Sequence, residues 1–123
     1  MLAYSLFALF FMGCGLIRIK DQLQRFIPGT YIRFSQHEFG KEYDTLVISL
    51  QSAAANEYKI VRRWKYERQV IGQRMEPAYQ IKASAAIFDT THHLLQEITT
   101  GRIYIVDVSG KCLFSGTVKY TKL

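Results

Sequence analysis

From Gly29 onward the chain is divided into short runs in which apolar and polar residues alternate, with turn-forming residues between the runs. Strict alternation over about four to eight residues is typical of a strand with one buried face. The run Asp44–Gln51 shows it clearly, with Leu46, Ile48 and Leu50 at every second position. No run in this part has the spacing of an interior helix. The sequence therefore predicts an all-β fold.

The alternating runs follow one another closely enough to form a single sheet. The expected strands are residues 30–36, 44–51, 58–70, 78–89, 92–99, 102–108 and 111–121. Ser109-Gly110 between the last two runs is a clear hairpin signal. Short strands joined by turns predict an antiparallel meander, and closure into a small barrel would remove exposed edges. We favour the barrel, with a sandwich as the alternative.

The N-terminal segment differs from the rest because its first charged side chain is Arg18. The apolar stretch Leu6–Met12 is short for a transmembrane helix, which needs about 20 residues, and suits a signal peptide. Phe11-Met12-Gly13-Cys14 resembles the lipobox at which bacterial lipoproteins are cleaved and acylated. Cys14 is therefore the predicted lipidation site. An uncleaved anchor and a buried first helix are the alternatives.

These observations predict three parts of the chain. Residues 1–13 are a signal peptide of the lipoprotein type, residues 14–28 a lipid anchor and tether, and residues 29–123 the β-barrel domain. One or two helical turns are expected in the tether, ending before Pro28. Acyl chains would hold the protein at the cell envelope, on the outer or inner membrane. Cys112 would then lack a disulfide partner, and we expect it to be a small buried hydrophobe.

The chain is basic, with 16 Lys and Arg residues against 10 Asp and Glu. A basic surface suits anionic lipids, an acidic protein or nucleic acid, and nucleic acid is the least favoured for a secreted domain. Basic residues are densest between Lys59 and Arg68. In a strand, Lys59, Arg63 and Lys65 share the outward face, so we predict that they bind a protein partner.

The opposite register of the same run points toward the barrel interior. It holds Trp64 and Tyr66 together with Arg62, whose charge needs a carboxylate or several acceptors when buried. Pairing or a position at the rim is favoured for Arg62 over ligand contact. The candidate ligand-binding wall residues are Tyr31, Arg62, Trp64, Tyr66 and Tyr79, with Ala83 and Ala85 as candidates for lining a cavity.

The chain shows no arrangement that indicates catalysis. The serines lie outside any G-x-S-x-G turn, and no two carboxylates are forced together. Asp44 and Asp89 are expected to be turn residues. His92 and His93 are adjacent in an expected strand and would point to opposite faces, so they do not form a metal site. We expect no enzyme activity, no metal and no cofactor.

Cys14, the segment Ile27–Tyr31 and the closing segment Leu113–Tyr120 resemble the small lipocalin-like, meander-barrel lipoproteins of Gram-negative bacteria. Ser115–Tyr120 is also similar to a segment of periplasmic lysozyme inhibitors, and the chain is similar in character to accessory lipoproteins of conjugative elements. These resemblances imply a membrane-anchored, non-enzymatic module that binds a protein partner in the envelope. A small apolar ligand in the barrel and lysozyme inhibition are the alternatives.

Overall fold

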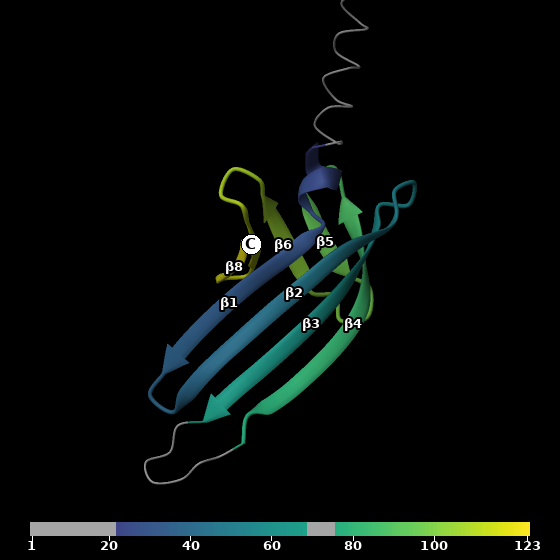
Figure 1. Ribbon diagram of the computed structural model, residues 1–123. Helices are drawn as coiled ribbons and strands as arrows, with labels where there is room; N and C mark the ends of the chain where they lie inside the picture. Colours follow the sequence, from purple (N-terminus) through teal and green to yellow (C-terminus); the bar gives the residue numbers. More distant parts are fainter. Residues whose placement is uncertain (1–21, 69–75) are drawn as a thin grey trace, which may run out of the picture.

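The computed structural model describes residues 22–68 and 76–123, which form a closed antiparallel barrel (Figure 1). Cys14 and the predicted signal peptide lie outside the described residues. The strands pair in chain order, and the last pairs with the first. They are β1 (Gly29–His37), β2 (Gly40–Ser52), β3 (Glu57–Arg68), β4 (Ala78–Asp89), β5 (Leu94–Glu97), β6 (Ile103–Asp107), β7 (Cys112–Ser115) and β8 (Val118–Lys122). The predicted all-β meander and its closure into a barrel are confirmed.

The number of strands differs from the prediction in the final run. The structure divides residues 111–121 between β7 and β8, with a turn at Gly116, whose φ is +61°. Glycine adopts this left-handed conformation without steric cost, so a tight hairpin forms there. The predicted hairpin turn at Ser109-Gly110 is confirmed between β6 and β7.

The barrel is closed over only part of its length. β8 pairs with β1 at Tyr31 and Ile32, and β5 pairs with the stretch from Ala86 to Asp89 in β4. The remaining lengths of β1 to β4 continue beyond the short strands as a curved four-stranded sheet (Figure 1). We call residues 33–45, 62–68 and 78–85 the β1–β4 extension.

Apolar side chains fill the closed part of the barrel. A helix over residues 22–26 covers this end, and its Leu23 is buried, as is Ile27 beside it. The Tyr31 hydroxyl donates a hydrogen bond of 2.9 Å to the Ile27 carbonyl, which ties the helix to β1. The short helix predicted before Pro28 is thus confirmed. No helix in residues 22–68 and 76–123 is long and apolar enough to cross a membrane. The inward core residues of the strands are Tyr31, Leu46, Ile48, Tyr58, Ile60, Ala86, Phe88, Leu95, Tyr104, Val106, Leu113 and Tyr120.

The register of β4 corrects the prediction for Tyr79. Tyr79 pairs with Lys65, so the two side chains share the outer face, and Tyr79 is 69% exposed. Ala83 and Ala85 belong to the same outward register. The inward register is the other one, which includes Lys82 and Phe88. Both registers of β4 contain apolar residues, so alternation alone did not distinguish them.

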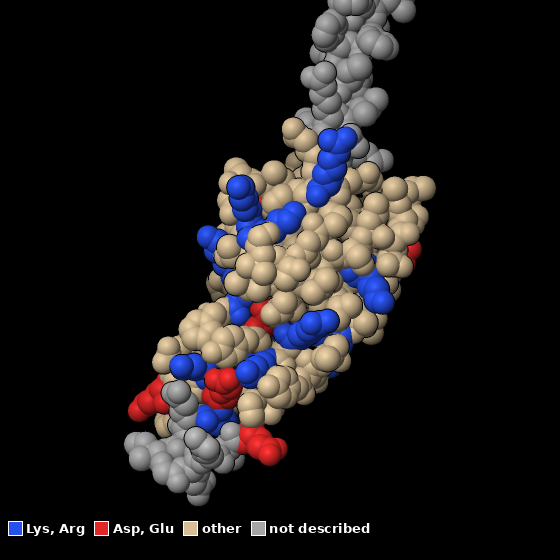
Figure 2. All heavy atoms as spheres, viewed as in Figure 1, with Lys and Arg blue, Asp and Glu red and all other residues tan. Residues whose placement is uncertain are grey.

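The predicted outward orientation of Lys59, Arg63 and Lys65 is confirmed, since they belong to the register opposite that of buried Tyr58 and Ile60. Figure 2 shows Lys and Arg side chains spread over this side of the molecule, while the Asp and Glu side chains visible there lie mostly near its lower end. Cys112 is buried, as expected, and is a free thiol. Burial raises the pKa of this thiol, which favours its protonated form.

Candidate functional site at the open end of the barrel

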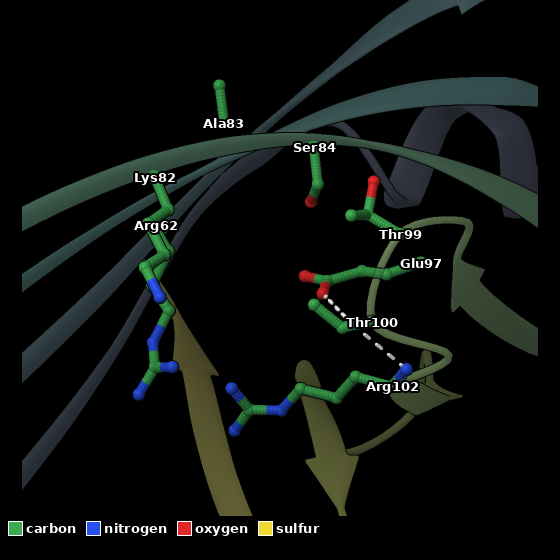
Figure 3. Close-up of a pocket in the computed structure, with 8 residues that line it drawn as sticks. All are labelled: Arg62, Lys82, Ala83, Ser84, Glu97, Thr99, Thr100 and Arg102. Carbon is green, nitrogen blue, oxygen red and sulfur yellow. Dashed lines mark hydrogen bonds between the residues drawn. The ribbon is translucent and has the colours of Figure 1, made fainter.

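A cavity of about 380 Å³ lies where the closed barrel meets the β1–β4 extension. Figure 3 shows Arg62 of β3, Lys82 of β4 and Arg102, next to β6, reaching into the same space. The methyl group of Ala83 points away from it. The lining residues are Arg62, Lys82, Ala83, Ser84, Glu97, Thr99, Thr100 and Arg102. We call this cavity the mouth pocket.

Asp44 holds Arg62 from beneath the mouth pocket. Its carboxylate is 1% exposed and accepts two well-aligned bonds from Arg62, 3.0 Å from Nε to Oδ1 and 2.8 Å from Nη2 to Oδ2. This bidentate contact raises the pKa of the guanidinium. The predicted pairing of Arg62 is confirmed, and the same residue lines the pocket. The prediction that Asp44 is a turn residue is wrong, because β2 begins at Gly40 and Asp44 lies within it.

Tyr120 connects Asp44 to the second guanidinium of the pocket. Its hydroxyl donates to Asp44 Oδ2 at 2.9 Å and accepts from Arg102 Nη2 at 2.8 Å. Arg102 Nε donates to Ser115 Oγ at 3.0 Å. The guanidinium also lies over the Tyr104 and Tyr120 rings, 5.3 and 5.8 Å from their centroids. Burial, and next the Asp44 charge, raises the pKa of Tyr120, so the linking hydroxyl stays protonated.

Two of the three cations at the mouth pocket, Arg102 and Lys82, form no ion pair with a carboxylate of the described residues. Within the described part of the chain, neither Arg102 nor Lys82 has a carboxylate oxygen within 4 Å. Glu97 is 5% exposed, and its oxygens accept bonds from Thr100 Oγ1 at 2.5 Å and the Tyr104 hydroxyl at 3.1 Å. Burial, and then the Glu97 charge, raises the pKa of Tyr104. The Glu97 carboxylate thus accepts its hydrogen bonds from hydroxyl groups. Arg102 and Lys82 face the cavity without a carboxylate partner among the described residues.

An aromatic stack continues from the pocket along the inner face of the β1–β4 extension. The rings of Trp64 and Tyr66 are parallel within 3°, with centroids 5.8 Å apart. The His37 ring stacks on the Tyr66 ring, with 5.9 Å between the ring centroids. Trp64 Nε1 donates to Glu42 Oε1 at 2.6 Å, which fixes the orientation of the indole. The predicted inward direction of Trp64 and Tyr66 is confirmed, although both rings are only half-buried.

The structure brings together only some of the predicted wall residues. Arg62 lines the pocket, and Trp64 and Tyr66 follow it on β3. Tyr31 is fully buried in the closed core, where its hydroxyl holds the helix, so its prediction as a ligand contact is wrong. Tyr79 is on the outer face, as described above. The sequence did not indicate the pocket-lining residues Lys82, Glu97 and Arg102 as site residues, nor Asp44, which contacts Arg62.

One signal in the sequence pointed to this network. Asp44 occupies the same register as Leu46 and Ile48, so a charged residue continues an otherwise apolar face. A carboxylate on a buried face requires a cation or several donors. The inward Arg62 on the next strand pairs with Leu46, which is two residues from Asp44 in β2. Oppositely charged residues on the inward faces of two neighbouring strands therefore predict an internal ion pair.

The described residues contain no group of three or more His, Cys, Asp and Glu side chains placed to hold a metal ion. The expected strand at His92 and His93 is wrong, because both residues lie in the turn between β4 and β5. His92 Nδ1 lies 2.8 Å from Asp89 Oδ2, and Asp89 Oδ1 accepts a hydrogen bond from the Thr91 amide. The predicted turn role of Asp89 is confirmed. A scan against protein-family models and searches of the curated proteins and of the solved structures found no match to this chain.

Proposed function

We propose that this protein is a non-enzymatic binding protein whose mouth pocket takes the anionic group of a small molecule. The observation that supports this is the hydrogen-bonded series Arg62–Asp44–Tyr120–Arg102, which holds two guanidinium groups beside one cavity. Lys82 adds a third cation from β4. Guanidinium groups bind carboxylate and phosphate oxygens in a planar, two-point geometry.

The charges of the pocket favour an anionic ligand over the wholly apolar one that the lipocalin-like resemblance implies. The closed end of the barrel is filled by its own side chains and by the covering helix. The open space lies instead among Arg62, Lys82 and Arg102, opposite the hydroxyl-solvated Glu97. A ligand carboxylate or phosphate would supply the negatively charged partner that Arg102 and Lys82 lack among the described residues.

Isothermal titration calorimetry with citrate and inorganic phosphate tests this function. We expect binding at low salt. Arg102→Gln or Lys82→Gln should raise the Kd by about ten- to hundredfold, because a hydrogen bond to a charged group is worth about 1.5–3 kcal/mol. Arg63→Gln, which removes a similar charge from the outer face, is the matched control and should leave the Kd unchanged. Absence of binding, or an equal loss in the control, would contradict the proposal.

We also propose that acylation at Cys14 anchors this binding module in the cell envelope, because the segment Phe11–Cys14 resembles a lipobox. The test is the intact mass of the full chain isolated from membranes of a Gram-negative host, beside Cys14→Ala. We expect a species that begins at Cys14 and carries diacylglyceryl and acyl groups. A mass that begins at Met1 in both proteins would contradict the anchor.

A second candidate function is supported by two rows of side chains on the outside of the β1–β4 extension. These rows, which we call the outer band, combine exposed apolar residues with two cations, as protein interfaces often do. Phe34 is 53% exposed and Ile81 is 69% exposed. Cross-strand pairing gives the rows as Phe34–Tyr43–Lys65–Tyr79 and Ile32–Thr45–Arg63–Ile81.

The outer band is ordered by contacts among its own side chains. Lys65 Nζ lies 5.5 Å from the centroid of the Tyr43 ring and 5.7 Å from that of the Tyr79 ring. The Phe34 and Tyr43 rings pack with their centroids 5.0 Å apart. Its Arg and Lys, with Lys59 farther along β3, favour a protein partner with an acidic surface.

Site-specific photo-cross-linking from position 79 tests this second function. We expect an adduct with one protein in the native envelope, which is lost when Lys59, Arg63 and Lys65 are replaced by Glu. Citrate binding in the mouth pocket should persist in that variant, because all three changes lie on the outer face. An adduct that survives the charge reversal would show that these cations do not recognise the partner.

A further inference from the structure

We infer that the anionic ligand of the mouth pocket also carries a flat ring, which stacks on Trp64. This inference rests on the proposed function and specifies its ligand as an aromatic anion, such as an aromatic carboxylate or a heteroaromatic phosphate. The argument depends on where Trp64 lies, which of its faces is covered and how firmly the indole is held.

Trp64 lies one inward position beyond the cations of the mouth pocket. It follows Arg62 by two residues in β3, a distance of about 6–7 Å along a strand. Its pairing partner in β4 is Gln80, which precedes Lys82 by two residues. A molecule whose anionic group contacts Arg62 and Lys82 therefore reaches the indole with its next few atoms.

The described members of the aromatic stack lie on the side of Trp64 that is farther from the pocket. Tyr66 stacks on Trp64 and is two residues farther from the pocket along β3. A ligand that reaches Trp64 from the pocket would stack on the other face of the indole, on the side of Arg62. Among the described residues, no ring or cation stacks on that second face. A ligand ring placed there would become the next member of the stack.

The indole is already held in the orientation that stacking requires. Glu42 accepts its N–H, and Tyr66 fixes its plane. Binding therefore orders no further side chain at this position, which favours affinity. Arg33 and Gln80 lie in the same cross-strand row and would offer donors to polar substituents on the edge of the ring.

Pairs of probes that differ only in the ring test the inference. AMP is compared with ribose 5-phosphate, and benzoate with cyclohexanecarboxylate, by calorimetry. We expect each aromatic probe to bind about tenfold more tightly than its partner, as base stacking on a protein ring does. Trp64 is the only tryptophan in the chain, so its fluorescence should be quenched by AMP but not by ribose 5-phosphate.

Variants at the stack show whether Trp64 causes the preference. Trp64→Leu should abolish the advantage of AMP while leaving the affinity for ribose 5-phosphate unchanged, and Trp64→Phe should restore part of it. Tyr79→Leu, which removes an outer ring, is the matched control. Thermal unfolding of each variant verifies that it is folded.

The possible results separate this inference from the proposed function. Equal affinities within each pair of probes, or an aromatic preference that survives Trp64→Leu, would contradict the stacking of a ligand ring on Trp64. Either result would leave the proposed anion binding unaffected. Failure of all four probes and of citrate to bind would overturn both.

Discussion

Asp44 is the residue on which the arrangement of the mouth pocket depends. It is 1% exposed and accepts hydrogen bonds from Arg62 and from the Tyr120 hydroxyl, which in turn holds Arg102. A single buried carboxylate thereby positions two guanidinium groups from opposite sides of the barrel. Without its charge, Arg62 would lose the carboxylate that it contacts.

We predict that Asp44→Asn lowers the free energy of unfolding by about 2–4 kcal/mol, somewhat less than for a fully buried pair. The expected loss is smaller because the Arg62 side chain is 33% exposed, so that water partly solvates its charge. Urea denaturation followed by circular dichroism measures the change. Glu38→Gln, on an exposed turn, is the control. A loss no larger than in this control would show that the pair is not stabilising.

The β1–β2 hairpin keeps the aromatic stack in place through Gly40. This residue begins β2 and is buried against β3. A Cβ atom there would lie 2.6 Å from the Glu67 carbonyl oxygen and 2.9 Å from the Tyr66 hydroxyl. The close approach of the two strands therefore requires glycine at this position.

Gly40→Ala is expected to destabilise the protein by about 1–3 kcal/mol, because backbone and ring must both move to admit the methyl group. Displacement of Tyr66 should also change the fluorescence of Trp64, on which it stacks. Chemical denaturation and the emission spectrum measure these effects. Phe39→Ala, at an exposed neighbour, should change neither. A native emission spectrum in Gly40→Ala would contradict the coupling.

Tyrosines from four strands supply much of the barrel interior. Burial is the first cause that raises the pKa of Tyr31, Tyr58, Tyr104 and Tyr120. The Tyr58 hydroxyl has no hydrogen-bond partner within the described residues. The folded barrel thus retains four phenolic protons at pH values where the unfolded chain releases them.

This difference predicts alkaline unfolding. The unfolded phenols have a pKa of about 10, so the contribution is complete below pH 10 and is lost as the pH rises toward the higher folded pKa values. Absorbance at 295 nm and circular dichroism should show these tyrosines ionising together with unfolding. Tyr58→Phe, which removes the unpaired hydroxyl, should shift this transition to higher pH. Complete ionisation with a native circular dichroism spectrum would contradict the prediction.

Local pattern was sufficient for most of the fold. Alternation predicted the strands, except that it joined β7 and β8 into one run. Pro28 predicted the end of the short helix, and Ser109-Gly110 predicted the turn between β6 and β7. The outward direction of Arg63 and the inward direction of Trp64 followed from the period of two along one strand. These properties depend on neighbouring residues, so the sequence alone determined them.

The tertiary structure decided the register of β4 and the composition of the mouth pocket. Tyr79 belongs to the outer face only because pairing places it opposite Lys65. The contact between Asp44 and Tyr120 joins residues 76 positions apart and exists only after β8 closes on β1. Barrel closure is a long-range event that places side chains from distant strands together. Alternation along one strand carries no information about which distant residue will face it, so the pocket required the folded barrel.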